Sequence, residues 1–270
     1  AAKLVSVDEA LSHIHDGDVI GSGAAANEPA RLLGRLHSLN GRVHGLKFIS
    51  GLGMRDYPFL SDPVCRESFT TDCIFMMAAG RAAHRKGLTN VFPASLHNGI
   101  SRWMDHNPLN VFMVAVTPMD KHGYFRMSMC LIQEREMLEK ADLVIVEVTP
   151  DMPVIYGDNE IHISQVDFIV EGNGTLPEIP ASEPTVVEKA IGAHIAELVH
   201  DGDTIQLGIG GIPRCRGPMP AVQARLRGPH GDDHQQHRRL GGGRSGQWAE
   251  EIHPSGQDRG DIYPGQSDAL

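Results

Sequence analysis

The sequence predicts an α/β protein made of two tandem open α/β domains, the second of them truncated. Three observations lead to this fold class. Short apolar runs alternate with helical patterns, as in sheets that helices cover on both faces. One unit of helix, strand and glycine loop occurs twice, 185 residues apart. The composition of the 270-residue chain changes just after the second copy, at Pro213.

The first copy of the repeated unit lies at the start of the sequence. Ser6 and Glu9 have the spacing of a capping box, which predicts a helix after Ser6. The segment His15–Ile20 leads into a predicted strand, and the glycine loop Gly21–Gly23 follows it. Pro29 suits the first turn of the next helix. The predicted order is therefore helix, strand, loop and helix.

Between the two copies, strands and helices alternate. Four short apolar runs predict strands at Leu46–Ser50, Cys73–Met77, Val111–Val116 and Leu143–Val148. A helical pattern at Glu134–Ala141 separates the last two runs. Since parallel strands need crossover connections, this alternation predicts a mainly parallel sheet.

The second copy repeats the signals of the first. Thr185 and Glu188 form another capping box, and His200–Ile205 matches the earlier strand segment. The loop Gly208–Gly211 follows at the same offset. A linker rich in glycine and proline precedes the second copy, which predicts a domain boundary near Ala181.

The predicted domains are residues 1–180 and 181–213, and residues 214–270 differ from both. These last 57 residues contain no lysine, ten glycines, five prolines and only nine large apolar residues. So few apolar side chains cannot offset chain entropy, which predicts a poorly ordered tail. Read one base out of frame, the possible codons of residues 256–265 can encode G-K-I-V-A-T-F-T-L-G, which has apolar periodicity. We interpret the tail as an out-of-frame translation.

The composition disfavours several classes of function. With 34 acidic and 24 basic residues, the net charge of −10 disfavours a nucleic-acid binder, which needs a basic face. Every apolar run, Leu143–Val146 among them, is far short of the roughly 20 residues that span a bilayer. Neither nucleic acid nor a membrane is therefore expected as a partner. The four cysteines show no pairing or metal-ligand spacing, so a reducing cytoplasm and no metal site are expected.

Common catalytic motifs are missing from the sequence. H-E-x-x-H and G-x-S-x-G do not occur, and Pro213 stands where G-x-G-x-x-G would have its third glycine. A zinc protease, an α/β-hydrolase triad and a Rossmann dehydrogenase are therefore disfavoured. The glycine loops expose backbone N–H groups at helix starts, which suits a phosphate or an oxyanion. A tight turn explains a lone glycine loop as well.

Two polar segments follow the ends of predicted strands, where α/β sheets bind ligands. Asp120–Tyr124 follows the strand that ends near Val116. Tyr156–Asn159 comes after the next strand and leads into the short apolar segment Ile161–Ser164. An ordinary polar turn or an Asx turn would also account for these segments.

Three segments together resemble the acetyl-CoA hydrolase/transferase family, which includes 4-hydroxybutyrate and acetate CoA-transferases. They are Val116–Tyr124, Glu147–Ser164 and Gln206–Pro213, and they occur in family order within residues 1–213. The resemblance implies a pair of CoA-transferase-type α/β domains, in agreement with the repeat. It also implies that the family's chains continue well past residue 270, so this sequence is expected to be truncated.

The resemblance further implies a covalent mechanism. In the family, a glutamate of an H-T-E motif attacks the acyl-CoA thioester, and a glutamyl-CoA thioester then passes coenzyme A to an acceptor carboxylate. The corresponding stretch here reads Pro229-His230-Gly231. No residue of this chain inherits the nucleophile, so the chain as written is expected to be inactive.

The resemblance also suggests residues that bind the ligands. The candidates for oxyanion or coenzyme A binding are Gly208, Gly210 and Gly211. The candidates for the substrate pocket are Gly23, His122, Tyr124 and His162. Coenzyme A is expected as a substrate rather than as a bound cofactor, with an acyl-CoA and a small carboxylate such as acetate, butyrate or 4-hydroxybutyrate as the ligands.

The family's site lies between domains, so the segments Asp120–Tyr124 and Gly157–Ser164 are expected to face the second domain. The function itself has alternatives. Water in place of the acceptor carboxylate would make the protein an acyl-CoA hydrolase. A non-catalytic remnant, or an α/β protein that binds a phosphate-containing ligand, would belong to another class. A homo-oligomer is also expected.

Overall fold

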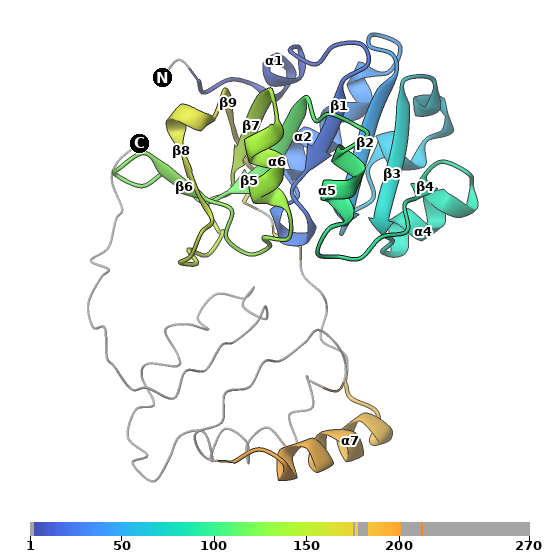
Figure 1. The fold of residues 1–270 in the computed structure, drawn as a ribbon, viewed down its shortest axis with the longest axis vertical. Helices are drawn as coiled ribbons and strands as arrows, with labels where there is room; N and C mark the ends of the chain where they lie inside the picture. The colour runs from blue at the N-terminus through green and yellow to red at the C-terminus, as the bar shows by residue number, and fades with distance from the viewer. Residues whose placement is uncertain (1–2, 175, 178–182, 201–211, 213–270) are drawn as a thin grey trace. The chain divides into compact units, whose positions relative to one another are not determined.

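The computed structural model describes residues 3–174, 176–177, 183–200 and 212. The chain divides into two units, residues 1–177 and 178–270, and each is described by itself. The centre of the first unit is a seven-stranded sheet, and Figure 1 shows it together with its helices.

Each strand of this sheet is parallel to its neighbours, and the strand order is β4-β3-β2-β1-β5-β7-β9. The strands are β1 (Val19–Ser22), β2 (Leu46–Leu52), β3 (Phe69–Phe75), β4 (Asn90–Val91), β5 (Val111–Val116), β7 (Leu143–Val148) and β9 (Phe168–Glu171). Strands β1 to β4 extend the sheet in one direction, whereas β5, β7 and β9 extend it in the other. The winding therefore reverses between β1 and β5, and the predicted parallel α/β sheet is confirmed for this unit.

Helices cover both faces of the sheet. They are α1 (Val7–Leu11), α2 (Ala30–Arg35), α3 (Pro58–Ser61), α4 (Ala78–Arg85), α5 (Gly99–Met104) and α6 (Glu134–Lys140). The 3-10 turns are η1 (Ala25–Asn27), η2 (Leu36–Leu39), η3 (Pro63–Glu67) and η4 (Ile163–Gln165). In Figure 1, α5 and α6 lie in front of the sheet and α2 lies behind it. This is the doubly wound arrangement that follows when parallel connections keep one hand.

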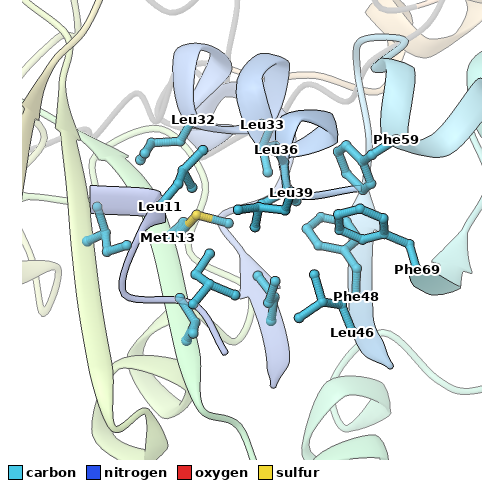
Figure 2. Close-up of a cluster of buried hydrophobic side chains, with 14 of the residues drawn as sticks. Leu11, Leu32, Leu33, Leu36, Leu39, Leu46, Phe48, Phe59, Phe69 and Met113 are labelled. Carbon is cyan, nitrogen blue, oxygen red and sulfur yellow. The ribbon is translucent and has the colours of Figure 1, made fainter. Parts of the chain in front are cut away.

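Alternating residues of the central strands divide the core into two layers. Met113 and Ile145 belong to the layer that also contains Phe48 of β2 and the leucines of α2 and η2 (Figure 2). Phe112 and Val146 belong to the opposite layer, with residues of α5 and α6. Because both faces of β5 and β7 are buried, these strands have continuous apolar sequences rather than alternating ones.

A short antiparallel ribbon adjoins the carboxyl end of β5. It consists of β6 (Tyr124–Arg126) and β8 (Glu160–His162). The backbone N–H of Thr117, just after β5, donates to the carbonyl oxygen of Arg126 at 3.0 Å. The ribbon therefore begins where the central sheet ends.

Most predicted elements of the first unit are present, with differences at their ends. Strands β5 and β7 have the predicted bounds, and α6 starts at the predicted residue. Strand β3 runs from Phe69 to Phe75, whereas the predicted strand is Cys73–Met77. The sequence pattern misses its start because the first half of β3 alternates buried and more exposed residues and lacks an apolar run. Pro29 is the N-cap of α2 rather than a residue of its first turn. Sequence patterns do not predict β4, β9, α3, α4 or α5.

In the second unit, the described helix is α7 (Val186–Glu197). Its predicted capping box is present: Glu188 donates its backbone N–H to Thr185 Oγ1 at 3.2 Å and accepts the N–H of Thr185 at 2.7 Å. The predicted second strand, the second glycine loop and residues 214–270 lie outside the described residues, so a second tandem domain stays a prediction. None of the described helices is long and apolar enough to cross a membrane.

Candidate active site

The carboxyl ends of β1 and β5 mark the reversal of winding, where open α/β sheets bind their ligands. The chain that leaves β1 here, residues 23–32, is called the β1–α2 segment below. Four buried polar side chains hold this segment. Asn27 and Glu28 belong to it, and Glu134 and Glu147 contact it from other parts of the chain. None of the four is more than 5% exposed, which is rare for charged side chains without polar partners.

The β1–α2 segment begins with a turn that only glycine fits. A Cβ on Gly23 would overlap the carbonyl oxygen of Asn27 and would lie 2.8 Å from Val114 Cγ2. Ala25 has a φ of +49°, a left-handed conformation that is unfavourable for a residue with a side chain. This backbone shape therefore depends on the contacts that hold the segment.

Two buried glutamates hold the ends of the segment by accepting backbone N–H groups. Glu134 Oε1 accepts the N–H of Ala24 at 3.0 Å. Glu147 Oε2, from β7, accepts the N–H groups of Arg31 and Leu32 at 2.9 and 3.0 Å and so caps α2. Burial raises the pKa of both carboxyls, and the backbone donors oppose this rise.

Asn27 joins the segment to the chain beyond β6. Its side chain is fully buried, and Nδ2 donates to the carbonyl oxygens of Met127 and Cys130. Met127 in turn donates its backbone N–H to the carbonyl oxygen of Asn159, next to β8, at 2.9 Å. A chain of hydrogen bonds therefore connects the β1–α2 segment with the ribbon.

Glu28 joins the segment to the connection between β2 and α3. Its Oε1 accepts the N–H of Met54 at 3.0 Å, and its Oε2 accepts the O–H of Tyr57 at 3.3 Å. Burial raises the pKa of Glu28 to about 7, although the Met54 N–H, the charge of Arg55 and the Tyr57 O–H act to lower it. Burial also raises the pKa of Tyr57, so the phenol keeps its proton. The Glu28 carboxyl therefore changes its charge near neutral pH.

The ribbon carries two of the predicted pocket residues, and a third, His122, lies in the turn just before β6. Tyr124 and His162 are paired across it, with ring centroids 4.9 Å apart. Asp120 Oδ1 accepts the backbone N–H groups of His122 and Tyr124 at 2.8 and 2.9 Å, and the Tyr124 donor is the main cause that lowers the pKa of Asp120. Gly123 has a φ of +87°, and a Cβ there would lie 3.2 Å from His162 Nε2.

The predicted pocket residues thus form two clusters. Tyr124 and His162 contact each other on the ribbon and His122 lies in the turn before β6, whereas Gly23 of the β1–α2 segment packs against Asn27 and Val114. The segment Asp120–Tyr124 enters the ribbon at the end where Tyr124 pairs with His162, whereas Tyr156–Asn159 enters it at the other end, where Arg126 pairs with Glu160. The orientation of the segments Asp120–Tyr124 and Gly157–Ser164 toward a second domain stays a prediction. The predicted oxyanion or coenzyme A ligands, Gly208, Gly210 and Gly211, lie outside the described residues.

Sequence patterns do not single out the buried polar residues of this edge. One signal is visible, because Glu147 interrupts the apolar run Leu143–Val148. An acid in a strand that is covered on both faces requires buried donors. Nothing local distinguishes Glu28 or Glu134 from an exposed acid, and Asn27 looks like an ordinary loop residue.

A small pocket opens at the carboxyl ends of β1, β2 and β3. It is lined by Ser22, Ala24, Gly51, Ile74, Leu96, Ile100, Ile132, Gln133, Glu134 and Met137. Its space is about the size of one water molecule. In the part of the chain that the structure describes, no three His, Cys, Asp or Glu side chains gather as metal ligands.

Comparison with protein families gives a match over most of the described chain. Residues 1–180 match the model of the acetyl-CoA hydrolase/transferase N-terminal domain. The chain is 34% identical over 219 residues to the succinyl-CoA:cyclohexane-1-carboxylate CoA transferase of Geobacter metallireducens. This alignment covers 78% of this chain and 48% of that protein. It is 32% identical over 212 residues to the 4-hydroxybutyrate coenzyme A transferase of Clostridium kluyveri, with 78% and 49% covered.

Solved structures agree with these matches. RipA from Yersinia pestis is 28% identical with a TM-score of 0.70, over 78% of this chain and 52% of that chain. A 4-hydroxybutyrate CoA-transferase from Porphyromonas gingivalis is 26% identical with a TM-score of 0.60, over 84% and 52%. The chain spans about half the length of the curated relatives it matches.

Proposed function

The chain belongs to the acetyl-CoA hydrolase/transferase family, and on that basis we propose that its reaction is the transfer of coenzyme A between an acyl-CoA and a small carboxylate. The family match over residues 1–180 carries this proposal. Relatives named as transferases of succinyl-CoA and 4-hydroxybutyrate support acyl-CoA and carboxylate as the ligand classes. Coenzyme A is then a substrate that leaves with the product.

The proposed mechanism passes through a glutamyl-CoA thioester. A glutamate carboxylate attacks the acyl-CoA carbonyl and forms a mixed anhydride, which releases coenzyme A as a thiolate. The thiolate attacks the glutamyl carbonyl and releases the first carboxylate. The acceptor carboxylate then attacks this glutamyl-CoA, releasing the thiolate again, and the thiolate takes the new acyl group and regenerates the glutamate. Each tetrahedral oxyanion needs backbone N–H donors, for which Gly208, Gly210 and Gly211 stay the candidates.

The residues of the first unit are proposed to shape the pocket for the acceptor. Gly23 lets the β1–α2 segment turn tightly at the sheet edge. The Tyr124 hydroxyl and the imidazoles of His122 and His162 can donate hydrogen bonds to a carboxylate on the ribbon. The domain ranges 1–180, 181–213 and 214–270, the cytoplasmic location and the homo-oligomer stay predictions.

The chain as written is proposed to lack transferase activity, because it has no H-T-E motif after the second glycine loop. The test incubates acetyl-CoA and labelled butyrate with this chain and with a chain that is read in the restored frame after Pro213 and continues past residue 270 to the length of its relatives. We expect exchange only in the restored chain, with a difference of at least about a thousandfold, because a covalent nucleophile is missing. Comparable exchange by both chains would contradict the proposal.

Two controls separate the alternatives. Replacing the glutamate of the restored H-T-E motif by glutamine should abolish exchange. Release of free thiol from acetyl-CoA without any acceptor would instead identify an acyl-CoA hydrolase. If the restored chain neither exchanges nor hydrolyses acyl-CoA, a non-catalytic protein is the better description.

A further inference from the structure

Glu28 lies between two loops that leave neighbouring strands of the sheet. It follows η1 in the β1–α2 segment, and its acceptors face residues 53–57, the connection from β2 to α3. Strands β1 and β2 are paired in parallel, so both loops emerge at the same carboxyl edge. One buried carboxyl therefore joins the loop after β1, which borders the reversal of winding, to the loop after β2.

Its contacts come from both backbone and side chain. Met54 offers a backbone N–H at 3.0 Å to Oε1, and Tyr57 offers its hydroxyl at 3.3 Å to Oε2. The charged or titratable groups that act on Glu28 are Arg55 and Tyr57 of the same loop. Arg55 also acts on Glu147 in β7, so its charge is shared between two buried acids.

The strength of these contacts depends on the charge of Glu28. A carboxylate accepts hydrogen bonds more strongly than a neutral carboxylic acid does. Because Glu28 is only 5% exposed, water does not replace the protein donors when the charge changes. Burial raises the pKa of this carboxyl to about 7, so the change falls near neutral pH.

We propose that Glu28 is a positioning residue: its carboxylate holds the connection from β2 to α3 against the β1–α2 segment, and protonation weakens this hold. Glu28 acts through the backbone N–H groups of Met54 and Arg55 and the hydroxyl of Tyr57, and it has no role in bond making. The inference rests on the proposed function in one respect, namely that this edge of the sheet shapes the pocket for acyl-CoA and carboxylate.

The test follows the Met54 amide by NMR in the 270-residue chain labelled with ¹⁵N-methionine. The chain has 11 methionines, and the Met54→Leu variant identifies the signal. We expect the Met54 amide shift to change between pH 5.5 and pH 8.5 with a midpoint near 7. In Glu28→Gln the same signal should stay constant, since the amide keeps an acceptor oxygen but cannot ionise.

Two further variants keep the test decisive. Tyr57→Phe removes one donor to the carboxylate and should move the midpoint to higher pH. Glu134→Gln changes another buried acid, which contacts Ala24, and should leave the pH dependence of the Met54 amide shift unchanged. A Met54 signal that is constant in the parent chain, or that titrates equally in Glu28→Gln, would overturn the inference. Failure of the exchange assay alone would reject the proposed function and leave this result in place.

Discussion

Glu28 should make the folding stability depend on pH in a specific direction. The unfolded chain ionises this carboxyl near pH 4.5 and the folded chain near 7, so between these values only the folded state keeps the proton. Its contribution to stability is complete below about pH 4.5, decreases as the pH rises to 7, and is constant above that. Between pH 5 and pH 8, the free energy of unfolding in urea should decrease by roughly 2 to 3 kcal/mol more for the parent chain than for Glu28→Gln.

Glu134 and Glu147 also have raised pKa values, but they are present in both proteins. The difference between the parent chain and the variant therefore isolates Glu28. Equal pH dependence of the two unfolding free energies would show that Glu28 is already ionised at pH 5.

Gly23 should tolerate no side chain. In Gly23→Ala the new Cβ overlaps the Asn27 carbonyl and presses on Val114, and overpacking of this kind costs about 1–3 kcal/mol. The matched control is Gly34→Ala in α2, where a Cβ meets nothing within 4 Å and alanine favours the helix by up to about 1 kcal/mol. Unfolding in urea should therefore show opposite signs for the two glycine substitutions. A neutral Gly23→Ala would mean that the turn can relax.

At the scale of elements, Asn27 connects η1 with the chain that follows β6. Its amide donates to the carbonyl oxygens of Met127 and Cys130, so an acceptor at this place would face two other acceptors. We expect Asn27→Asp to lower the unfolding free energy by more than Asn27→Ala, even though aspartate has nearly the same shape. The loss for Asn27→Asp should be about 3 kcal/mol at pH 8, because a buried group is both charged and unpaired.

The comparison of the two Asn27 variants is made by urea unfolding at pH 8 and again at pH 4. Protonation of the aspartate at low pH restores a hydrogen-bond donor. The difference in unfolding free energy between Asn27→Asp and Asn27→Ala should therefore be smaller at pH 4 than at pH 8. If Asn27→Ala is the less stable variant at pH 8, packing rather than hydrogen bonding explains the role of Asn27.

At the scale of the whole molecule, both core layers belong to the first unit. Their described residues run from Ala10 to Val170 and include Trp103, which is 2% exposed. A chain that ends at Pro180 should therefore unfold cooperatively, with a change in Trp103 fluorescence and a native circular dichroism spectrum. A broad transition or aggregation of this shortened chain would show that its core needs residues beyond 180.

The sequence alone determines the class of fold and several of its elements. The continuous apolar runs of β5 and β7 and the capping box at Thr185 depend on residues a few positions apart, so a linear pattern reveals them. Short elements such as β4, with two residues, leave no comparable pattern. The resemblance of the motifs to the family is likewise contained in the sequence.

Only the tertiary structure decides how the edge of the sheet is built. The partners of Glu28 begin 26 residues away, those of Asn27 about 100, and those of Glu147 about 115. No local pattern relates such positions, because they meet only after the crossovers have placed β2, β6 and β7 beside β1 and β5. Burial then removes water as an alternative partner, and this is why ordinary loop residues become the buried contacts that shape the site.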